Sequence, residues 1–442
     1  MIIVTCFALA IYLGISIIKW RNLYNPLTIF CTMWLIICFL AELKLFGMYN
    51  YSFRAPLVIL IGATGMFLGC ILGRHYKLKL KRIPFFGIDP SANYVLREKI
   101  YVVLLAISII VYGIMASSIV GLLASGYSAS TIRELYRDSG ETAISGMADT
   151  LIYGTKFLKY LDMYFAKPVV ICSIPIMSVE LTQKGKLTLP IALSAVALAL
   201  STFVNFGRVN ILVFFITLLL AFLIQKKNIS KTLKTRVKVI AFFVIILGAI
   251  LLEYITNYRS SGSNVNTLQN LYAYFAIPVP LLDYWISKVN FINGYSFGFS
   301  YISGFVANIM NVLARYNLKP EPYKIAEYFN YNQVDHFIYV FPNYRYNAYV
   351  SMFFAFYLDF RELGVFFGSL LFGYAIARGY KRASLKPIYL SFYLLLFQSL
   401  IWSFVRWYFV IVSYCFAFIL MRLLYKKEDS NVSYTKYKAN HP

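Results

Sequence analysis

The sequence predicts an all-α integral membrane protein that crosses the bilayer about eleven times, and three observations support this prediction. Hydrophobic residues make up 60% of the 442-residue chain and charged residues only 14%, whereas soluble domains average about 25% charged residues. The hydrophobic residues gather in stretches close to the roughly 20 residues that a helix needs to cross a bilayer. The basic residues are concentrated in alternate connections between these stretches.

Eleven stretches qualify as predicted transmembrane helices, with a range of about 10 to 13 for the final count. They cover residues 2–18, 26–43, 55–73, 100–123, 163–181, 189–206, 209–225, 239–256, 363–379, 387–405 and 407–424. The first lacks a basic segment before it and a small-residue cleavage site, so we interpret it as a retained helix. Gly65, Gly69 and Gly73 form a ridge of small residues on the third, which favours close helix packing. All six cysteines lie in apolar stretches, which favours buried side chains over disulfides or a thiolate–metal site.

The placement of positive charge predicts the orientation of the chain. The formal net charge is +24, but Lys and Arg cluster in alternate short loops, which argues against a nucleic-acid partner. These loops and the C-terminal tail hold 26 of the 42 basic residues. By the positive-inside rule that side is cytoplasmic. The N-terminus is therefore expected outside and the C-terminus inside.

We expect residues 1–442 to form a single membrane-embedded domain with two large outward loops. The first covers residues 124–162 and the second covers residues 257–362. The tail, residues 425–442, is expected in the cytoplasm. Because long polar loops are usually functional or disordered, and the second is too aromatic for disorder, we expect it to handle the substrate.

Two segments of the long loop are too apolar to remain in water. Residues 271–286 contain Pro278 and Pro280, which argue against one straight helix. Residues 295–314 are rich in Gly, Ser and Asn, which favours a helix that lies on the membrane or dips into it. Together they are expected to form a lid over a membrane-embedded cavity.

Three arginines at outer helix ends are candidates for binding a lipid-linked phosphate. Arg208 directly precedes one apolar stretch, Arg259 follows another, and Arg406 lies in the tight turn between the last two. A guanidinium near the membrane face must snorkel, pair or bind an anion, and its planar fork suits phosphate. Snorkelling or a salt bridge explains each arginine alone equally well. Three arginines together favour a pyrophosphate site.

Candidates for acid–base chemistry lie in the long outer loop. His336 follows Asp335 and can accept a hydroxyl proton if its pKa is near neutral; a structurally bonded loop histidine is the alternative. Asp359 and Glu362 lie where the chain returns to the membrane and can orient an acceptor sugar, although helix capping explains Asp359 equally well. Further sugar-binding or supporting candidates are Asp283, Asp335, Arg345 and the intramembrane carboxylate Glu253.

The sequence contains no P-loop, no G-x-G-x-x-G, no H-E-x-x-H and no G-x-S-x-G motif, which are the signatures of nucleotide, zinc and serine-hydrolase chemistry. We therefore expect no cofactor and no metal. A substrate that carries its own activated bond is the simplest alternative.

Several sequence features match one known family. They are Asn-Phe-Gly-Arg (205–208) before a span, Tyr-Phe-Ala-Ile-Pro-Val-Pro (274–280), Gly-Tyr-Ser-Phe-Gly (294–298), Asn347, and Tyr-Leu-Asp-Phe-Arg-Glu-Leu-Gly (357–364). With ten or more spans and one long outer loop, the chain resembles the Wzy-type oligosaccharide repeat-unit polymerases, also called O-antigen polymerases. The last motif is similar to the family's Tyr-x-Asp-Phe-Gly-x-x-Gly, except that Arg361 replaces a glycine.

The resemblance implies a glycosyltransferase in the inner membrane of a bacterium. It would transfer a glycan from undecaprenyl pyrophosphate to the non-reducing end of an incoming lipid-linked repeat unit, on the outer face, in O-antigen or capsule synthesis. Arginines would stabilise the leaving pyrophosphate, and His336 or an outward carboxylate would activate the acceptor hydroxyl. The implied partners are the lipid-linked oligosaccharide, membrane lipid, a chain-length regulator and a flippase.

Two other functions stay open from the sequence. A flippase or exporter of lipid-linked oligosaccharide is expected to have short loops, internal symmetry and basic residues within a central cavity. An O-antigen ligase would share the architecture and the chemistry of the polymerase.

Overall fold

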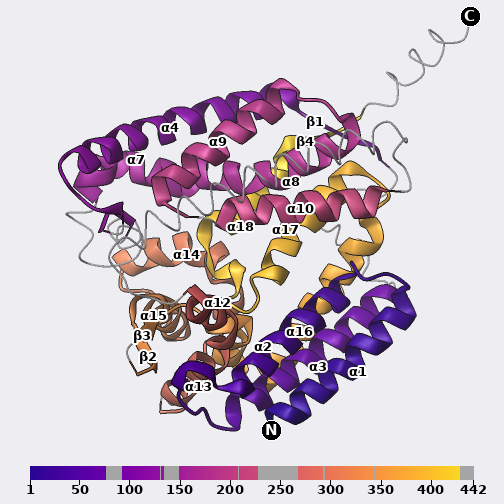
Figure 1. Cartoon of the computed structure of the whole chain (residues 1–442). Helices are drawn as coiled ribbons and strands as arrows, with labels where there is room; N and C mark the ends of the chain where they lie inside the picture. The colour runs from indigo at the N-terminus through magenta and orange to yellow at the C-terminus, as the bar shows by residue number, and fades with distance from the viewer. Residues whose placement is uncertain are drawn as a thin grey trace, which may run out of the picture. The chain divides into compact units, whose positions relative to one another are not determined.

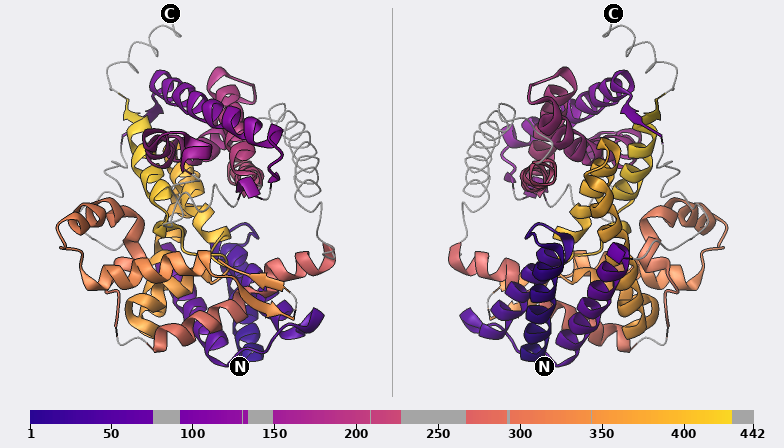
Figure 2. Two further views of the ribbon diagram at one scale, coloured as in Figure 1. Left: turned by 90° about the vertical axis from the view of Figure 1, so that its left-hand side faces the viewer. Right: turned by 90° about the vertical axis from the view of Figure 1, so that its right-hand side faces the viewer.

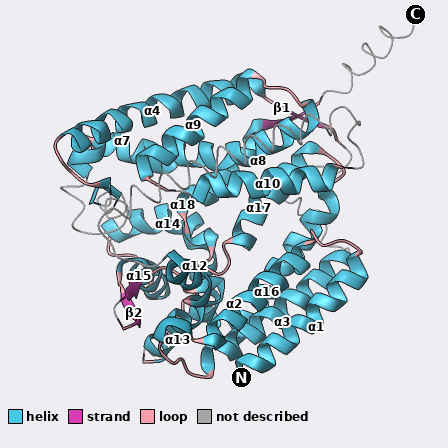
Figure 3. Ribbon diagram, in the orientation of Figure 1, coloured by secondary structure: helices cyan, strands magenta, loops and turns pink. Residues whose placement is uncertain are grey.

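The described part of the chain is built almost entirely of helices (Figure 1). The computed structural model describes residues 1–75, 92–129, 131–133, 149–207, 209–226, 267–291, 294–342 and 344–428. Among these residues only four short strands interrupt the helices (Figure 3). The predicted fold class is therefore confirmed at the level of an α-helical protein.

Six helices in the described ranges are long and apolar enough to cross a membrane. They are α1 (Ile2–Trp20), α2 (Pro26–Leu43), α3 (Arg54–His75), α4 (Glu98–Ala124), the helical run Lys156–Lys184 and α16 (Ser351–Ala383). Shorter apolar helices are α9 (Leu189–Asn205), α10 (Val209–Gln225), α17 (Pro387–Ile401) and α18 (Val412–Leu424). These helices indicate a membrane protein. The predicted stretch 239–256 lies outside the described residues.

The chain divides into two compact units. The first comprises Met1–Tyr76, Glu253–Lys381 and Leu396–Cys415, and the second comprises Lys77–Leu252, Arg382–Leu395 and Phe416–Pro442. The predicted long outer loop belongs to the first unit.

In the first unit, α3 and α16 pack closely through the predicted glycine ridge. A Cβ atom at Gly65, Gly69 or Gly73 would collide with a backbone carbonyl of α16, and a Cβ at Gly373 would collide with that of Met66 on α3. Figure 1 shows these two helices side by side with α1 and α2. Small residues allow such close approach of helix backbones in membranes, so the helix-packing interpretation of the ridge is confirmed.

One end of the α3–α16 pair is basic. The Arg74 guanidinium lies 4.7 Å from the centre of the Trp20 ring, and Lys381 Nζ donates to the Arg74 carbonyl over 3.1 Å. Arg54 begins α3 twenty residues earlier. At 1.5 Å per residue this places the two ends of α3 about 30 Å apart, close to the thickness of a bilayer core.

Helix α16 is sharply kinked near the predicted return to the membrane. Phe360 (φ −148°, ψ 33°) and Arg361 (φ 53°, ψ −135°) leave helical geometry. After the kink, a Cβ atom at Gly364 would collide with the carbonyl of Phe356. Helix α16 begins at Ser351, twelve residues before the predicted stretch 363–379. The kink at Phe360 and Arg361 lies at the predicted boundary between the long loop and that stretch.

The described part of the predicted long outer loop folds into four helices and a hairpin before α16 begins. They are α12 (Thr267–Ala276), α13 (Pro278–Asn290), α14 (Phe299–Arg315), α15 (Glu321–Asp335), and the antiparallel strands β2 (Ile338–Phe341) and β3 (Tyr344–Tyr346). The hairpin appears as orange arrows in the left view of Figure 2. Helices α12 and α13 are separated at Ile277, with Pro278 in the first turn of α13, which confirms the predicted break at the prolines.

Helix α14 is amphipathic. Its small residues Ser300, Ser303, Gly304 and Ala307 are buried, and a Cβ atom at Gly304 would approach the carbonyls of Phe409 and Ile411 too closely. Its exposed residues include Ile302, Ile309 and Val312. An exposed apolar face of this kind agrees with the expectation of a helix that lies on the membrane.

The second unit contains a buried ion pair within a helical run. The run consists of α7 (Lys156–Leu161), the π-helical turn η4 (Asp162–Ala166) and α8 (Lys167–Lys184). Asp162 is fully buried, pairs with Lys167 over 3.1 Å, and accepts a hydrogen bond from Tyr153 of the turn η3 (Asp149–Tyr153). A short sheet of β1 (Tyr94–Leu96) and β4 (Tyr425–Lys427) closes this unit.

Candidate functional site

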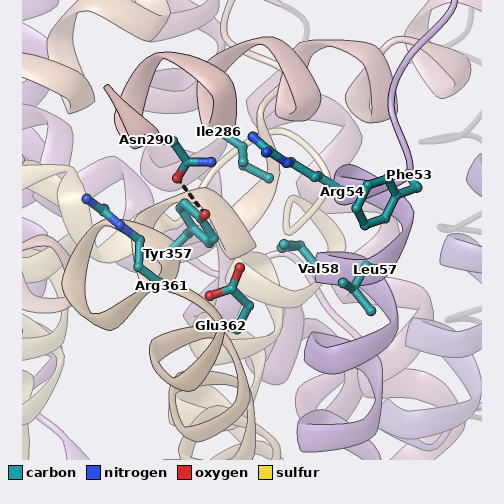
Figure 4. Close-up of a pocket in the computed structure, with 9 residues that line it drawn as sticks. All are labelled: Phe53, Arg54, Leu57, Val58, Ile286, Asn290, Tyr357, Arg361 and Glu362. Atoms are coloured by element: carbon teal, nitrogen blue, oxygen red, sulfur yellow. Dashed lines mark hydrogen bonds between the residues drawn. The ribbon is translucent and has the colours of Figure 1, made fainter. Parts of the chain in front are cut away.

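A cavity of about 370 Å³ lies in the first unit, at the kink of α16 (Figure 4). Three elements form it: the beginning of α3, the end of α13 and the kinked part of α16. The residues that line it are Phe53, Arg54, Leu57, Val58, Ile286, Asn290, Tyr357, Arg361 and Glu362. Its size is within the usual range of small-molecule sites, about 300–1,000 Å³.

The polar side of this cavity combines both charges with neutral hydrogen-bonding groups. Glu362 and Arg54 are exposed, and in Figure 4 both side chains extend into the space between the helices. The Tyr357 hydroxyl donates to Asn290 Oδ1 over 2.8 Å, which joins α16 to α13. Phe53, Leu57 and Ile286 provide an apolar side. Such a combination suits a polyhydroxylated ligand with an apolar or anionic neighbour.

Arg361 lies on the other side of the Tyr357 ring from Arg54 (Figure 4). Its Nη2 atom donates to the carbonyl of Gly294 over 2.8 Å and to that of Val289 over 3.4 Å. The guanidinium also lies over two aromatic rings, 4.9 Å from the centre of Tyr295 and 5.5 Å from that of Tyr357. Arg361 thus joins the kink to the last turn of α13 and to Gly294 and Tyr295.

Asp359 has a capping role rather than a place in the cavity lining. It is 3% exposed, and its carboxylate accepts hydrogen bonds from the Ser296 hydroxyl and from backbone amides at the beginning of α14. The amide donors are Gly298 (2.9 Å), Ser300 (3.0 Å) and Tyr301 (3.0 Å). A carboxylate at a helix N-terminus satisfies unpaired amides and complements the helix dipole. The alternative of helix capping therefore describes Asp359, but the capped helix is α14.

His336, at the end of α15, contacts Trp285 of α13 and is not among the residues that line the cavity. Its ring is exposed and stacks on Trp285, with ring centres 6.5 Å apart and an angle of 12° between planes. Its backbone amide donates to the carbonyl of Asn332, which is the last helical hydrogen bond of α15. Ile286, the residue after Trp285, does line the cavity. The side chain of Asp335 lies outside the described part of the structure.

Two of the three supporting candidates in the loop, Asp283 and Arg345, have partners in the structure. Asp283 accepts hydrogen bonds from the backbone and side chain of Ser52, two residues before the first residue of α3. The Arg345 guanidinium lies 5.3 Å from the ring centre of Tyr339, its partner across the hairpin. Burial raises the pKa of the neighbouring Tyr346 to about 12, because a buried phenolate is poorly solvated.

The three arginines predicted to bind pyrophosphate are only partly described. Arg406 is half-buried in the first unit, and its backbone forms a bridge to Ser351 at the beginning of α16. Arg208, Arg259 and the carboxylate Glu253 lie outside the described residues.

The structure therefore brings Glu362 together with residues that sequence reasoning missed, above all Arg54, Asn290 and Tyr357. A usable signal existed for Arg54, because it directly precedes the third apolar stretch on the predicted outer side. Arg208 and Arg406 are predicted site residues for the same reason, because each directly precedes an apolar stretch on the predicted outer side. Asn290 and Tyr357 carry no comparable signal, since polar aromatic and amide residues are common throughout the loop.

The fold and this cavity together define an α-helical membrane protein with a charged, partly aromatic site at one end of a membrane-length helix pair. Comparison of the chain with family models, with curated proteins and with solved structures finds no match. The particular function is therefore inferred from the cavity and the sequence.

Proposed function

We propose that this protein is a glycosyltransferase that polymerises undecaprenyl-pyrophosphate-linked oligosaccharide repeat units at the outer face of the bacterial inner membrane. The observation that carries the proposal is the cavity at the α16 kink, where a carboxylate, a guanidinium, an amide and a phenol meet beside apolar residues. A sugar next to a membrane-anchored diphosphate presents hydroxyls, negative charge and an apolar chain to the protein. Each has a matching group in the cavity.

In this proposal Glu362 is the general base. Its carboxylate accepts the proton of the acceptor hydroxyl while that oxygen attacks the anomeric carbon of the donor glycan. The bond from that carbon to the pyrophosphate breaks, and undecaprenyl pyrophosphate leaves with the electron pair. A positioned carboxylate contributes about 10²–10⁴-fold to such a step. Of the three predicted catalytic residues, Glu362 is the one in the cavity lining.

Arg54 is proposed to stabilise negative charge on the lipid-linked substrate. Its guanidinium is exposed and extends into the cavity, and a cation next to developing negative charge stabilises a transition state. Arg208, Arg259 and Arg406 are retained as proposed ligands of the donor pyrophosphate.

The charge distribution along α3 supports an outward-facing cavity. Arg54 and the cavity lie at one end of the helix, and Arg74 with Lys381 lies at the other, about a bilayer thickness away. If the basic end faces the cytoplasm, as the positive-inside rule requires, the cavity opens where lipid-linked sugars are assembled on the outer surface.

The experiment that tests this function is the size profile of surface glycan in a bacterial strain that lacks the protein. A polymerase predicts surface chains of a single repeat unit, because export and attachment survive. Accumulation of repeat units on the inner side would instead identify a flippase. Full-length polymer that stays on the lipid carrier would identify a ligase.

A further inference from the structure

Arg361 occupies a backbone conformation that favours glycine. Its φ of 53° with ψ of −135° lies outside the helical and extended regions of L-residues. A non-glycine residue held in such a conformation is strained, and strain of this kind persists only where the surrounding structure or the function maintains it. The side chain must therefore contribute something that glycine lacks.

The contacts of Arg361 identify that contribution. One nitrogen, Nη2, donates to the carbonyl of Val289 in the last turn of α13 and to that of Gly294, which precedes α14. The rings of Tyr295, the residue after Gly294, and of Tyr357, which lines the cavity, both lie within cation–π distance of the guanidinium. A single side chain thus links the kink of α16 with the wall of the cavity.

We infer that Arg361 is a positioning residue that holds the end of α13 and the residues Gly294 and Tyr295 against the kink and thereby sets the width of the cavity beside Glu362. The neighbouring position of Glu362 in the chain makes this coupling direct, because any change at the kink moves the carboxylate. The inference rests on the proposed function for its activity test, and a distance measurement tests it independently.

Three variants distinguish the effect of the backbone strain at Arg361 from the effect of its side-chain contacts. Arg361→Gly removes the side chain and relieves the backbone strain, Arg361→Ala removes the side chain and keeps the strain, and Arg361→Lys keeps a cationic donor. Arg315→Ala, at the exposed end of α14, is the matched control. Each is measured as the full-length protein in detergent or nanodiscs.

The first measurement is the distance distribution between spin labels at Lys288→Cys on α13 and Leu371→Cys on α16, both exposed, with the six native cysteines replaced. We expect a narrow distribution with Arg361 and with the Arg315→Ala control. Arg361→Gly should give a broader distance distribution than the unmodified protein, although its unfolding temperature should be at least as high. Arg361→Lys should restore much of the narrow distribution. An unchanged distribution in Arg361→Gly overturns the inference whatever reaction the protein catalyses.

The second measurement is polymer formation by the same variants. A displacement of about 1 Å in a catalytic arrangement can reduce a rate by roughly 10²-fold, so Arg361→Gly should lower kcat by about ten- to a hundredfold and Arg361→Lys should recover part of it. Full kcat in Arg361→Gly contradicts a positioning role. If the unmodified protein forms no polymer, the proposed function fails, and the spin-label distances still decide the role of Arg361.

Discussion

At the scale of single residues, burial separates two carboxylates that are three positions apart. Asp359 is buried and its oxygens are occupied by donors at the beginning of α14, whereas Glu362 is exposed and lines the cavity. The sequence suggested similar roles for both, because their local motif contains no information about a helix that begins sixty residues earlier. Only the tertiary fold brings the α14 amides to Asp359.

Replacing Asp359 with alanine should therefore destabilise the protein. The substitution leaves three backbone amides and a hydroxyl without their acceptor, which should reduce the free energy of unfolding by about 2–4 kcal/mol. Thermal unfolding of the purified variant in detergent measures this. Glu362→Gln serves as the comparison and should keep the unfolding temperature of the unmodified protein; equal stability of both variants would refute the capping role.

At the scale of elements, the packing of α3 against α16 positions Arg54 opposite Glu362. The glycine ridge of α3 and the break before α13 could both be predicted, since glycine spacing and proline act through local sequence. The kink of α16 could not be predicted in this way. A positive φ is usually indicated by glycine in the sequence, and this position holds Arg361. The sequence therefore predicts Glu362 at the end of a loop, whereas the structure places it within α16, just after the kink.

Enlarging Gly69 should separate the two helices. A Cβ atom there would collide with the backbone carbonyl of Leu370, so Gly69→Val should reduce stability by about 1–3 kcal/mol through overpacking. Gly14→Ala in α1 is the control, because a Cβ at Gly14 meets nothing within 4 Å and alanine favours the helix. The unfolding temperatures of both variants decide the matter, and a Gly69→Val protein as stable as the control would contradict the close packing.

At the scale of the whole molecule, hydrophobic stretches and charge placement predicted the helical membrane class and an orientation. The described helices support the class, and the orientation stays a prediction. Division of the chain into two units, with the first assembled from three separate segments, could not be predicted, because hydrophobicity marks a helix without identifying its neighbours.

The predicted orientation can be measured by labelling cysteines in intact cells. Tyr339→Cys on the hairpin is exposed and should react with a membrane-impermeant maleimide from outside. Ser384→Cys, exposed in the basic connection after α16, should react only after the cells are opened. The native cysteines are buried or half-buried, which keeps the background low. The opposite labelling pattern would invert the orientation and place the cavity at the cytoplasmic face.

The central claim is that Glu362 activates an acceptor sugar in a polymerase reaction, and a reconstituted assay tests it most directly. Purified protein in liposomes is given a defined undecaprenyl-pyrophosphate-linked repeat unit without nucleotide. The unmodified protein should produce a ladder of polymer and release one undecaprenyl pyrophosphate for each linkage. Glu362→Gln should lower the rate by about 10²–10⁴-fold while it remains folded. Equal rates for the two proteins, or no polymer from the unmodified protein, would contradict the claim.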